Sequence, residues 1–388
     1  GHRPAQLQER GGATGASRMS KFMLMAGGTG GHLFPAMALA QELLRRGHVV
    51  ELMTDHRVES YGADFPASAV HIVPSATPSL RNPVKFIGGG LKIVRGIAVA
   101  LGKLRRARPD CVIGFGGYPT FPPFVAASLL GIPGILHEQN AVMGRANRAL
   151  GRFADLLAMS FAQTKFADEL NLERVVTGNP VRDRVRAVSG IPYPELSENG
   201  PVRIVIFGGS QGAKALSDIV PAAIAAVPEA LRQRLDIVQQ CRAEDLDRVA
   251  EVYRQAKVNV ELAAFFTDLP ERIAQSHLVI GRSGASTIAE LTVLGRPAIL
   301  VPLPGAIDAD QKNNALVVDA AGGGWIAEQA SLSPQSLASR LTALLSDPAA
   351  LIRAADAART LGQPRAVEKL ADLAEMLSGK NIEVDPHP

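Results

Sequence analysis

The sequence predicts an α/β protein made of two similar Rossmann-like domains, each a doubly wound parallel sheet. Short apolar runs alternate with amphipathic helical patterns, which is typical of a parallel sheet covered on both faces. A unit of strand, Gly-Gly-x-x-Gly turn and helix begins near residue 21 and begins again near residue 202. The length of 388 residues favours two or three domains.

The first unit starts with an apolar strand at 21–26, continues through a glycine turn at 27–32 and ends in a helix at 35–46. Segment 111–136 has no charged residue and is long enough to span a bilayer, but its many Gly and Pro residues would break a helix repeatedly. We therefore expect a strand, a loop, a short helix and a strand there, and no transmembrane helix. The other strands expected in this half are 49–54, 69–74, 111–115 and 132–137.

The second unit repeats this order, with a strand at 202–207, a glycine turn at 208–212 and a helix at 213–227. Two more strands are expected at 278–281 and 298–302. The final helical patterns cover 334–346, 348–360 and 364–378.

Turn-forming residues divide the chain into five parts. Residues 1–20 are polar and rich in Gly and Arg, so we interpret them as a tag remnant or a disordered extension. The Pro- and Gly-rich segment 179–201 reads as a linker. The remaining parts are a first domain at 21–178, a second at 202–362, and a C-terminal helix and tail at 363–388 that can dock back on the first domain.

Composition limits the classes of function. Apolar residues make up 47% of the chain and charged residues 20%, which excludes global disorder. The two cysteines, Cys111 and Cys241, are too few for a disulfide framework or a four-cysteine zinc site and favour a reducing compartment. Aromatic residues at 5% argue against a nucleic-acid partner, because such proteins stack bases on exposed rings.

Both glycine turns suit an anion. A glycine turn before a helix brings backbone N–H groups and the helix dipole to a phosphate, although it also serves as a plain tight turn. The first turn lacks the Gly-Lys-Ser/Thr of a P-loop, and Leu33 replaces the third glycine of a dinucleotide fingerprint. Asp55 still occupies the position of the acidic ribose ligand, so a nicotinamide enzyme is disfavoured rather than excluded.

Seven short segments occur in one order along the chain and together resemble the MurG family of bacterial peptidoglycan glycosyltransferases. The resemblance covers about residues 21 to 378. The segments are 27–36 (GGTGGHLFPA), 114–119 (GFGGYP), 137–140 (HEQN), 178–182 (GNPVR), 208–213 (GGSQGA), 282–285 (RSGA) with Glu290, and 310–315 (DQKNNA).

This resemblance implies a GT-B type fold, with two domains facing across a cleft. The C-terminal domain would bind UDP-N-acetylglucosamine and the N-terminal domain the acceptor lipid. The implied reaction is inverting transfer of N-acetylglucosamine to the C4 hydroxyl of undecaprenyl-pyrophosphoryl-N-acetylmuramyl-pentapeptide, in peptidoglycan precursor synthesis for cell wall biogenesis, cell shape and division. The alternatives are a UDP-N-acetylglucosamine epimerase on the same fold and a nucleotide-binding adaptor without turnover.

Two groups compete for the role of general base. His32 lies where the first glycine turn meets a helix, and a helix N-terminus lowers the pKa of an imidazole, which suits a proton acceptor. The pair His137 and Glu138 ends an apolar strand and lacks the second histidine of a zinc motif. Each candidate also has a purely structural interpretation, and the sequence leaves the choice open.

By resemblance, a second set of residues binds the sugar nucleotide. A guanidinium such as Arg182 suits a diphosphate. Glu290 would hold the ribose hydroxyls, although Thr287 and Glu290 also have the spacing of a helix capping box. The full expected set is Thr29, Gly30, Gly31, Asn140, Arg182, Ser210, Gln211, Phe266, Glu290 and Gln311.

We expect neither a metal nor another cofactor. Asp308 and Asp310 spell the Asp-x-Asp of metal-dependent sugar transferases, but they lie in a different sequence context. A helix N-terminus and Arg182 are sufficient to neutralise a diphosphate.

The net charge of +4 is concentrated in one part of the chain, because residues 65–109 contain no acidic residue. Basic and apolar residues alternate there, which favours binding to an anionic membrane surface over a solvated helix face or a nucleic-acid groove. Together with the membrane-bound acceptor that the resemblance implies, this pattern predicts a peripheral protein. The resemblance further implies the cytoplasmic face of the bacterial inner membrane, with cell-wall synthesis and cytoskeletal proteins as further partners. The expected membrane-facing residues are Arg81, Lys85, Phe86, Lys92 and Arg95.

Overall fold

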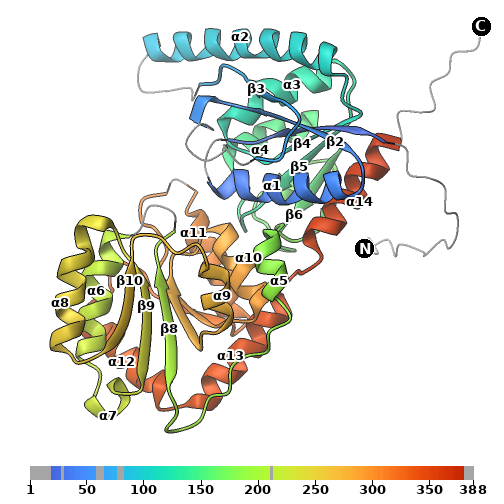
Figure 1. Ribbon diagram of the computed structural model, residues 1–388. Coiled ribbons are helices and arrows are strands. Elements are labelled where there is room, and N and C mark those ends of the chain that lie inside the picture. The colour runs from blue at the N-terminus through green and yellow to red at the C-terminus, as the bar shows by residue number, and fades with distance from the viewer. Residues whose placement is uncertain are drawn as a thin grey trace, which may run out of the picture.

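The structure is a computed structural model of the chain. It describes residues 19–27, 30–57, 65–76, 83–209, 213–306 and 308–379, and the side chains of helix α2 from residue 88 onward. Within these residues the strands form two parallel sheets, one in each of two stacked domains (Figure 1). The predicted fold class is therefore confirmed. Almost all of the expected N-terminal extension lies outside the described residues.

The first sheet has seven strands in the order β3-β2-β1-β4-β5-β6-β7, and every neighbouring pair is parallel. The order reverses between β1 and β4, which is where α/β folds of this type bind ligands. Its strands are β1 (Lys21–Met25), β2 (Val49–Thr54), β3 (Val70–Ile72), β4 (Cys111–Gly114), β5 (Gly134–Glu138), β6 (Leu156–Met159) and β7 (Glu173–Val176). Its helices are α1 (Gly30–Arg45), α2 (Pro83–Ala107), α3 (Phe121–Leu129) and α4 (Arg145–Leu150).

The second sheet has six strands in the order β10-β9-β8-β11-β12-β13, again all parallel, with the reversal between β8 and β11. These strands are β8 (Val202–Phe207), β9 (Leu235–Gln240), β10 (Asn259–Ala263), β11 (Leu278–Gly281), β12 (Ala298–Leu300) and β13 (Gly324–Ile326). The helices that surround this sheet and join the domains are α5 (Asp183–Val188), α6 (Lys214–Ala225), α7 (Glu229–Arg232), α8 (Leu246–Gln255), α9 (Leu269–Ala274), α10 (Ala285–Leu294), α11 (Asp310–Ala320), α12 (Pro334–Leu345), α13 (Pro348–Leu361) and α14 (Ala366–Gly379).

Helix α1 starts at Gly30, five residues before the position that its apolar pattern predicts. The glycine turn is thus partly the first helical turn, and Pro35 lies inside the helix. The first N–H groups of a helix have no partner within the helix, and this end of α1 lies at the carboxyl end of β1. This placement brings His32 to the reversal point of the sheet.

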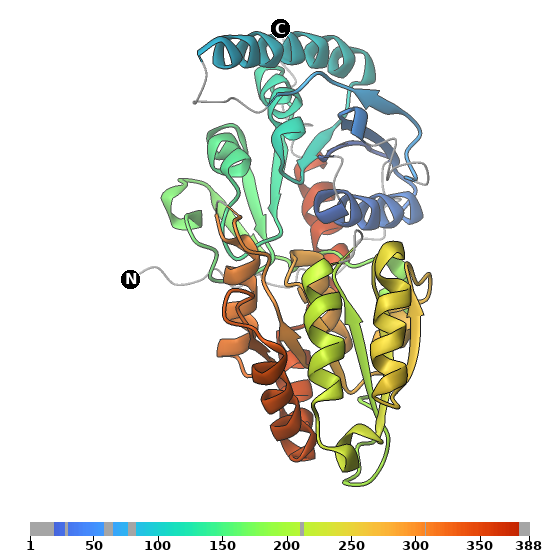
Figure 2. The same ribbon diagram turned by 90° about the vertical axis from the view of Figure 1, so that its left-hand side faces the viewer.

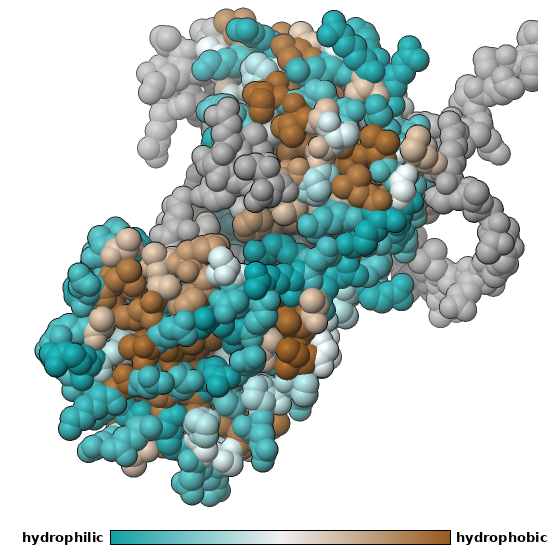
Figure 3. Space-filling model, viewed as in Figure 1, coloured by the Kyte–Doolittle hydropathy of each residue, from teal (hydrophilic) through white to brown (hydrophobic). Residues whose placement is uncertain are grey.

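The uncharged segment 111–136 folds as predicted, into strand β4, a glycine loop, helix α3 and strand β5. In the described ranges, none of the helices has both the length and the apolar character that crossing a bilayer requires. The long helix α2 lies along the outer end of the first domain, where hydrophobic and hydrophilic surface alternate (Figures 1 and 3).

Helix α14 leaves the second domain and packs on the first, close to α1 (Figure 2). Leu370 and Ala374 are buried in the same apolar cluster as Phe22 and Leu24 of β1. The chain therefore passes between the domains twice, once through the segment around α5 and once between α13 and α14.

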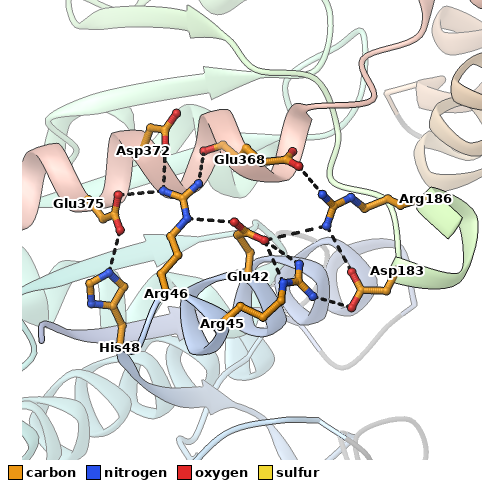
Figure 4. Close-up of polar contacts among 9 residues, drawn as sticks. All are labelled: Glu42, Arg45, Arg46, His48, Asp183, Arg186, Glu368, Asp372 and Glu375. Atoms are coloured by element: carbon orange, nitrogen blue, oxygen red, sulfur yellow. Dashed lines mark hydrogen bonds and ion pairs between the residues drawn. The ribbon is translucent and has the colours of Figure 1, made fainter. Parts of the chain in front are cut away.

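Ion pairs join α1, α5 and α14 at the edge of this contact (Figure 4). Arg46 contacts Asp372 at 2.7 Å, Glu375 at 2.8 Å and Glu42 at 2.9 Å. Arg45 pairs with Asp183 of α5 at 2.7 Å. We call this set the helix-junction cluster; it comprises Glu42, Arg45, Arg46, His48, Asp183, Arg186, Glu368, Asp372 and Glu375.

Replacing Arg46 should loosen α14. Its side chain is 22% exposed and pairs with three carboxylates, so Arg46→Gln leaves those charges without their shared partner. We expect the free energy of unfolding in urea to fall by roughly 1–3 kcal/mol. Arg45→Gln is the matched control, because Arg45 is 45% exposed and should cost less than about 1 kcal/mol. Equal losses in the two variants would contradict this ranking.

Candidate active site

A cleft of about 280 Å³ opens between the two domains. One wall is formed by the carboxyl ends of β1, β4 and β5, and the other by the loop that precedes α11. In an open α/β sheet, this edge is where ligands bind. The lining residues are His32, Gly116, Gly117, Tyr118, Glu138, Gln139, Asn140, Val142, Gly144, Arg145, Ala146, Asn147, Ala306, Asp308 and Asp310.

His32 lies in the first turn of α1 and packs against the glycine loop after β4. Gly116 and Gly117 have φ angles of +86° and +79°, a conformation that favours glycine. A Cβ atom on Gly116 would lie 3.4 Å from His32 Cδ2, and one on Gly117 would lie 3.6 Å from Cε1. These are ordinary contact distances, so the positive φ angles, and not a clash with the imidazole, explain why glycine occupies both positions.

The surroundings of His32 keep its imidazole neutral. Burial, assisted by the Arg57 guanidinium and opposed by the Asp310 carboxylate, lowers the pKa of His32 to about 4. At neutral pH the ring is therefore uncharged and able to accept a proton, as a general base requires.

Glu138 ends β5, and its carboxylate holds the loop that follows. It accepts hydrogen bonds from the backbone N–H of Asn140 at 3.0 Å, the N–H of Gly144 at 3.0 Å and the Asn147 amide at 2.8 Å. Burial raises the pKa of Glu138, and these donors act against that shift. The carboxylate thus shapes the floor of the cleft through the backbone that it binds.

His137 has a different position from its neighbour. Its side chain is fully buried and, among the described residues, is not part of the cleft lining. Its Nε2 lies 3.0 Å from the Gly178 carbonyl oxygen and its Nδ1 lies 3.0 Å from the Gln139 amide nitrogen. Burial lowers the pKa of His137 to about 4. The neutral ring therefore connects β5 to the segment that leads into the second domain.

Arg182 and Glu290, the residues expected to bind the diphosphate and the ribose, form an ion pair with each other. Arg182 Nη2 lies 2.9 Å from Glu290 Oε1, and the guanidinium lies 5.0 Å from the centre of the Phe34 ring. The capping-box interpretation of Glu290 is wrong, because α10 starts at Ala285 with Gly284 as its N-cap. Glu290 is instead in the middle of the helix and faces the first domain's α1 through Arg182.

The other expected donor residues are placed differently. Gln311 accepts a hydrogen bond from the Leu303 N–H at 2.9 Å through its side-chain oxygen. Phe266 is 7% exposed and belongs to the core, with the Arg272 guanidinium 4.4 Å from its ring centre, whereas the adjacent Phe265 is 67% exposed. Gly30 and Gly31 lie in the first turn of α1. Thr29, Ser210 and Gln211 lie outside the described residues.

Asn314 joins the two walls of the cleft, a role that the sequence analysis missed. Its amide nitrogen donates to Asn140 Oδ1 at 2.9 Å and to the Ser283 carbonyl at 3.1 Å. Its amide oxygen accepts from the Ala141 N–H at 2.8 Å. Asn314 does lie in the 310–315 segment that resembles the family, so the segment itself was recognised. Its role was missed because its partners lie far away in the sequence.

Asp308 also connects the domains. Its Oδ1 lies 3.2 Å from Arg148 Nη2 and 3.6 Å from Arg145 Nε, both on α4. An aspartate that is paired with two arginines is a poor ligand for a cation. In the described part of the chain, no group of three or more His, Cys, Asp or Glu residues is arranged to hold a metal ion.

Two Rossmann-like domains with a histidine-lined cleft between them define a glycosyltransferase class. The family model described as "Glycosyltransferase family 28 N-terminal domain" matches residues 22–159, and "Glycosyltransferase family 28 C-terminal domain" matches residues 203–375. Together they cover most of the chain.

A curated relative specifies the family further. A Methylobacterium nodulans protein named UDP-N-acetylglucosamine–N-acetylmuramyl-(pentapeptide) pyrophosphoryl-undecaprenol N-acetylglucosamine transferase is 52% identical over 354 residues, which cover 90% of this chain and 95% of that protein. The crystal structure of Acinetobacter baumannii MurG has a TM-score of 0.75 and 30% identity, and the match covers 92% of this chain and 99% of that one. The chain belongs to the MurG family of glycosyltransferases.

The epimerase alternative has a weaker likeness. A UDP-GlcNAc 2-epimerase from Neisseria meningitidis matches with a TM-score of 0.64 at 17% identity, over 92% of this chain and 99% of that one. At this identity the match shows the shared fold alone.

The buried His137 should make stability depend on pH. Because its folded pKa of about 4 lies below the ordinary 6.5, the unfolded chain binds a proton more readily, and stability falls as pH drops from 6.5 towards 4. The contribution is of order 3 kcal/mol. In His137→Gln, the free energy of unfolding in urea should depend less steeply on pH when it is measured at pH 8, 6 and 5. The free energy of unfolding that the variant loses at pH 8 measures the missing hydrogen bonds. An unchanged dependence of this free energy on pH would contradict the prediction.

Proposed function

We propose that this enzyme transfers N-acetylglucosamine from UDP-N-acetylglucosamine to the C4 hydroxyl of the membrane-bound undecaprenyl-pyrophosphoryl-N-acetylmuramyl-pentapeptide, in peptidoglycan precursor synthesis. The observation that carries this proposal is a cleft in which the two family 28 domains contribute different chemistry. The first domain lines the cleft with a neutral histidine, and the second lines it with Asp308 and Asp310. Arg182 and Glu290, which pair at 2.9 Å, are the residues that we expect to bind the diphosphate and the ribose.

The acceptor's C4 hydroxyl attacks the anomeric carbon of the donor sugar. As the new C–O bond forms, an imidazole nitrogen of His32 takes the hydroxyl proton, and the bond from the anomeric carbon to the UDP oxygen breaks with inversion. UDP leaves with the electron pair of that bond. His32 is favoured over His137 as the base, because His32 lines the cleft whereas His137 is fully buried outside its lining.

The donor is held mainly from the second domain. Arg182 would neutralise the diphosphate and Glu290 would accept hydrogen bonds from the ribose hydroxyls. Asn140 and Gln311 would contact the sugar, together with Thr29, Gly30, Gly31, Ser210, Gln211 and the region of Phe266. We infer that catalysis needs no metal, because an arginine and helix N-termini provide the positive charge for the leaving group.

We further infer that α2 places the enzyme on an anionic membrane, on the cytoplasmic face, where its lipid acceptor lies. Leu91 and Val94 are 68% and 64% exposed, beside the exposed Lys92 and Arg95. An apolar face flanked by cations suits the interface of a bilayer. Arg81 and the side chains of Lys85 and Phe86 lie outside the described residues. Cell-wall synthesis and cytoskeletal proteins remain proposed partners.

UDP release measures the proposed reaction directly. We expect UDP to appear from UDP-N-acetylglucosamine only when a short-chain muramyl-lipid acceptor is present, at the same rate with EDTA. His32→Gln should lower kcat by roughly 100- to 10,000-fold, since it removes the base, while binding of UDP stays near that of the parent. UDP binding without acceptor-dependent release would overturn the transferase and favour the adaptor, and loss of rate in EDTA would overturn the metal-free mechanism.

Vesicle binding tests the role of α2. The double variant Lys92→Gln, Arg95→Gln should bind anionic vesicles roughly ten- to thirtyfold more weakly at low salt, since each cation near the surface contributes about 1 kcal/mol. The matched control is Arg254→Gln with Arg353→Gln, two exposed cations of the second domain. If the control weakens binding as much as the α2 variant, the attraction is a property of net charge and not of this helix.

A further inference from the structure

The second domain places a carboxylate on the cleft opposite His32. Asp310 is the first residue of α11, and it lines the same cleft as His32 of the first domain. Ala309 immediately before it has a φ of +48°, an uncommon conformation for alanine. Such a conformation persists where the surrounding structure requires it.

Contacts across the domain interface fix Asp310 on both sides. Before it, Asp308 pairs with Arg148 and Arg145 of α4. After it, Asn314 is one helical turn further along α11 and bonds to Asn140 and Ala141. The start of α11 is therefore held to the first domain, and Asp310 lies between the two anchors.

The surroundings of His32 weaken it as a base, and a nearby carboxylate opposes that effect. An imidazole that is desolvated and close to the Arg57 guanidinium is a weak base, because both effects oppose its protonated form. The Glu138 carboxylate on the cleft wall accepts hydrogen bonds from the 140–144 backbone and from Asn147. Asp310 is the acidic group whose charge favours protonated His32, much as an aspartate stabilises the imidazolium of a catalytic triad.

We propose that Asp310 is a positioning residue that strengthens His32 as a base, and that it acts only when the two domains are closed. This inference rests on the proposed role of His32 and adds to it. When the acceptor hydroxyl transfers its proton to His32, the imidazolium forms opposite a carboxylate that belongs to the other domain. An open enzyme would carry the weaker base, so proton transfer is tied to closure over both substrates.

The first test follows the titration of His32 by NMR in the full-length chain with ¹³C-labelled histidine and bound UDP. Arg57→Gln should raise the pKa of His32 into a range in which the fold is intact. In the Arg57→Gln background, Asp310→Asn should lower the pKa of His32 by roughly half a unit to one unit. Asp310→Glu in place of Asp310→Asn should keep most of the original pKa of His32. Asn314→Ala should shrink the effect of Asp310→Asn, because α11 loses an anchor. A His32 titration that does not change with Asp310→Asn would overturn the proposal.

The second test separates this role from a sugar contact. Asp310→Asn should reduce kcat roughly three- to tenfold and move the acid limb of the pH profile to lower pH, with little change in KM for UDP-N-acetylglucosamine. A raised KM with the acid limb unmoved would mean that Asp310 binds the donor, and would overturn the proposal. Full activity of His32→Gln would instead overturn the assignment of the base, and the NMR titration of His32 would still report the pairing with Asp310.

Discussion

The packing of α14 against the first domain is the contact on which the rest of the arrangement depends. This helix follows the second sheet in sequence but buries its apolar face with β1 and α1 of the first. Since the segment around α5 also joins the domains, the two sheets are connected at two places along one edge. Their carboxyl ends then face each other across the cleft, and residues from both can act on one reaction.

In and around the cleft, some polar side chains hold the backbone in place and others face the open space. Glu138 and His137 are adjacent, buried and polar, and each is occupied by backbone groups that it orients. His32 differs because it lines the cleft and packs against the glycine loop after β4. The ion pair of Arg182 and Glu290 joins the segment before α5 to α10.

Local patterns predicted much of this structure. Glycine turns after apolar runs located strands β1 and β8 and placed His32 where the first turn meets a helix, because a turn is specified by adjacent residues. The structure shows that both strands lie at the sheet reversals. Edge strands such as β7 were missed, since they carry exposed polar residues in place of an apolar run. The capping-box interpretation of Glu290 failed because Gly284 starts the helix earlier than Thr287. Asn314 and Asp310 gain their roles from partners in another domain, which spacing along the chain does not reveal.

Helix α1 has His32 at one end and the helix-junction cluster at the other. Glu42 lies ten residues after His32, which at 1.5 Å per residue is about 15 Å along the helix axis. A rotation of about 10° around the cluster would therefore displace the imidazole by roughly 2.6 Å. A small change in angle at the helix-junction cluster is thus amplified along α1 into a displacement of His32 by about the length of a hydrogen bond.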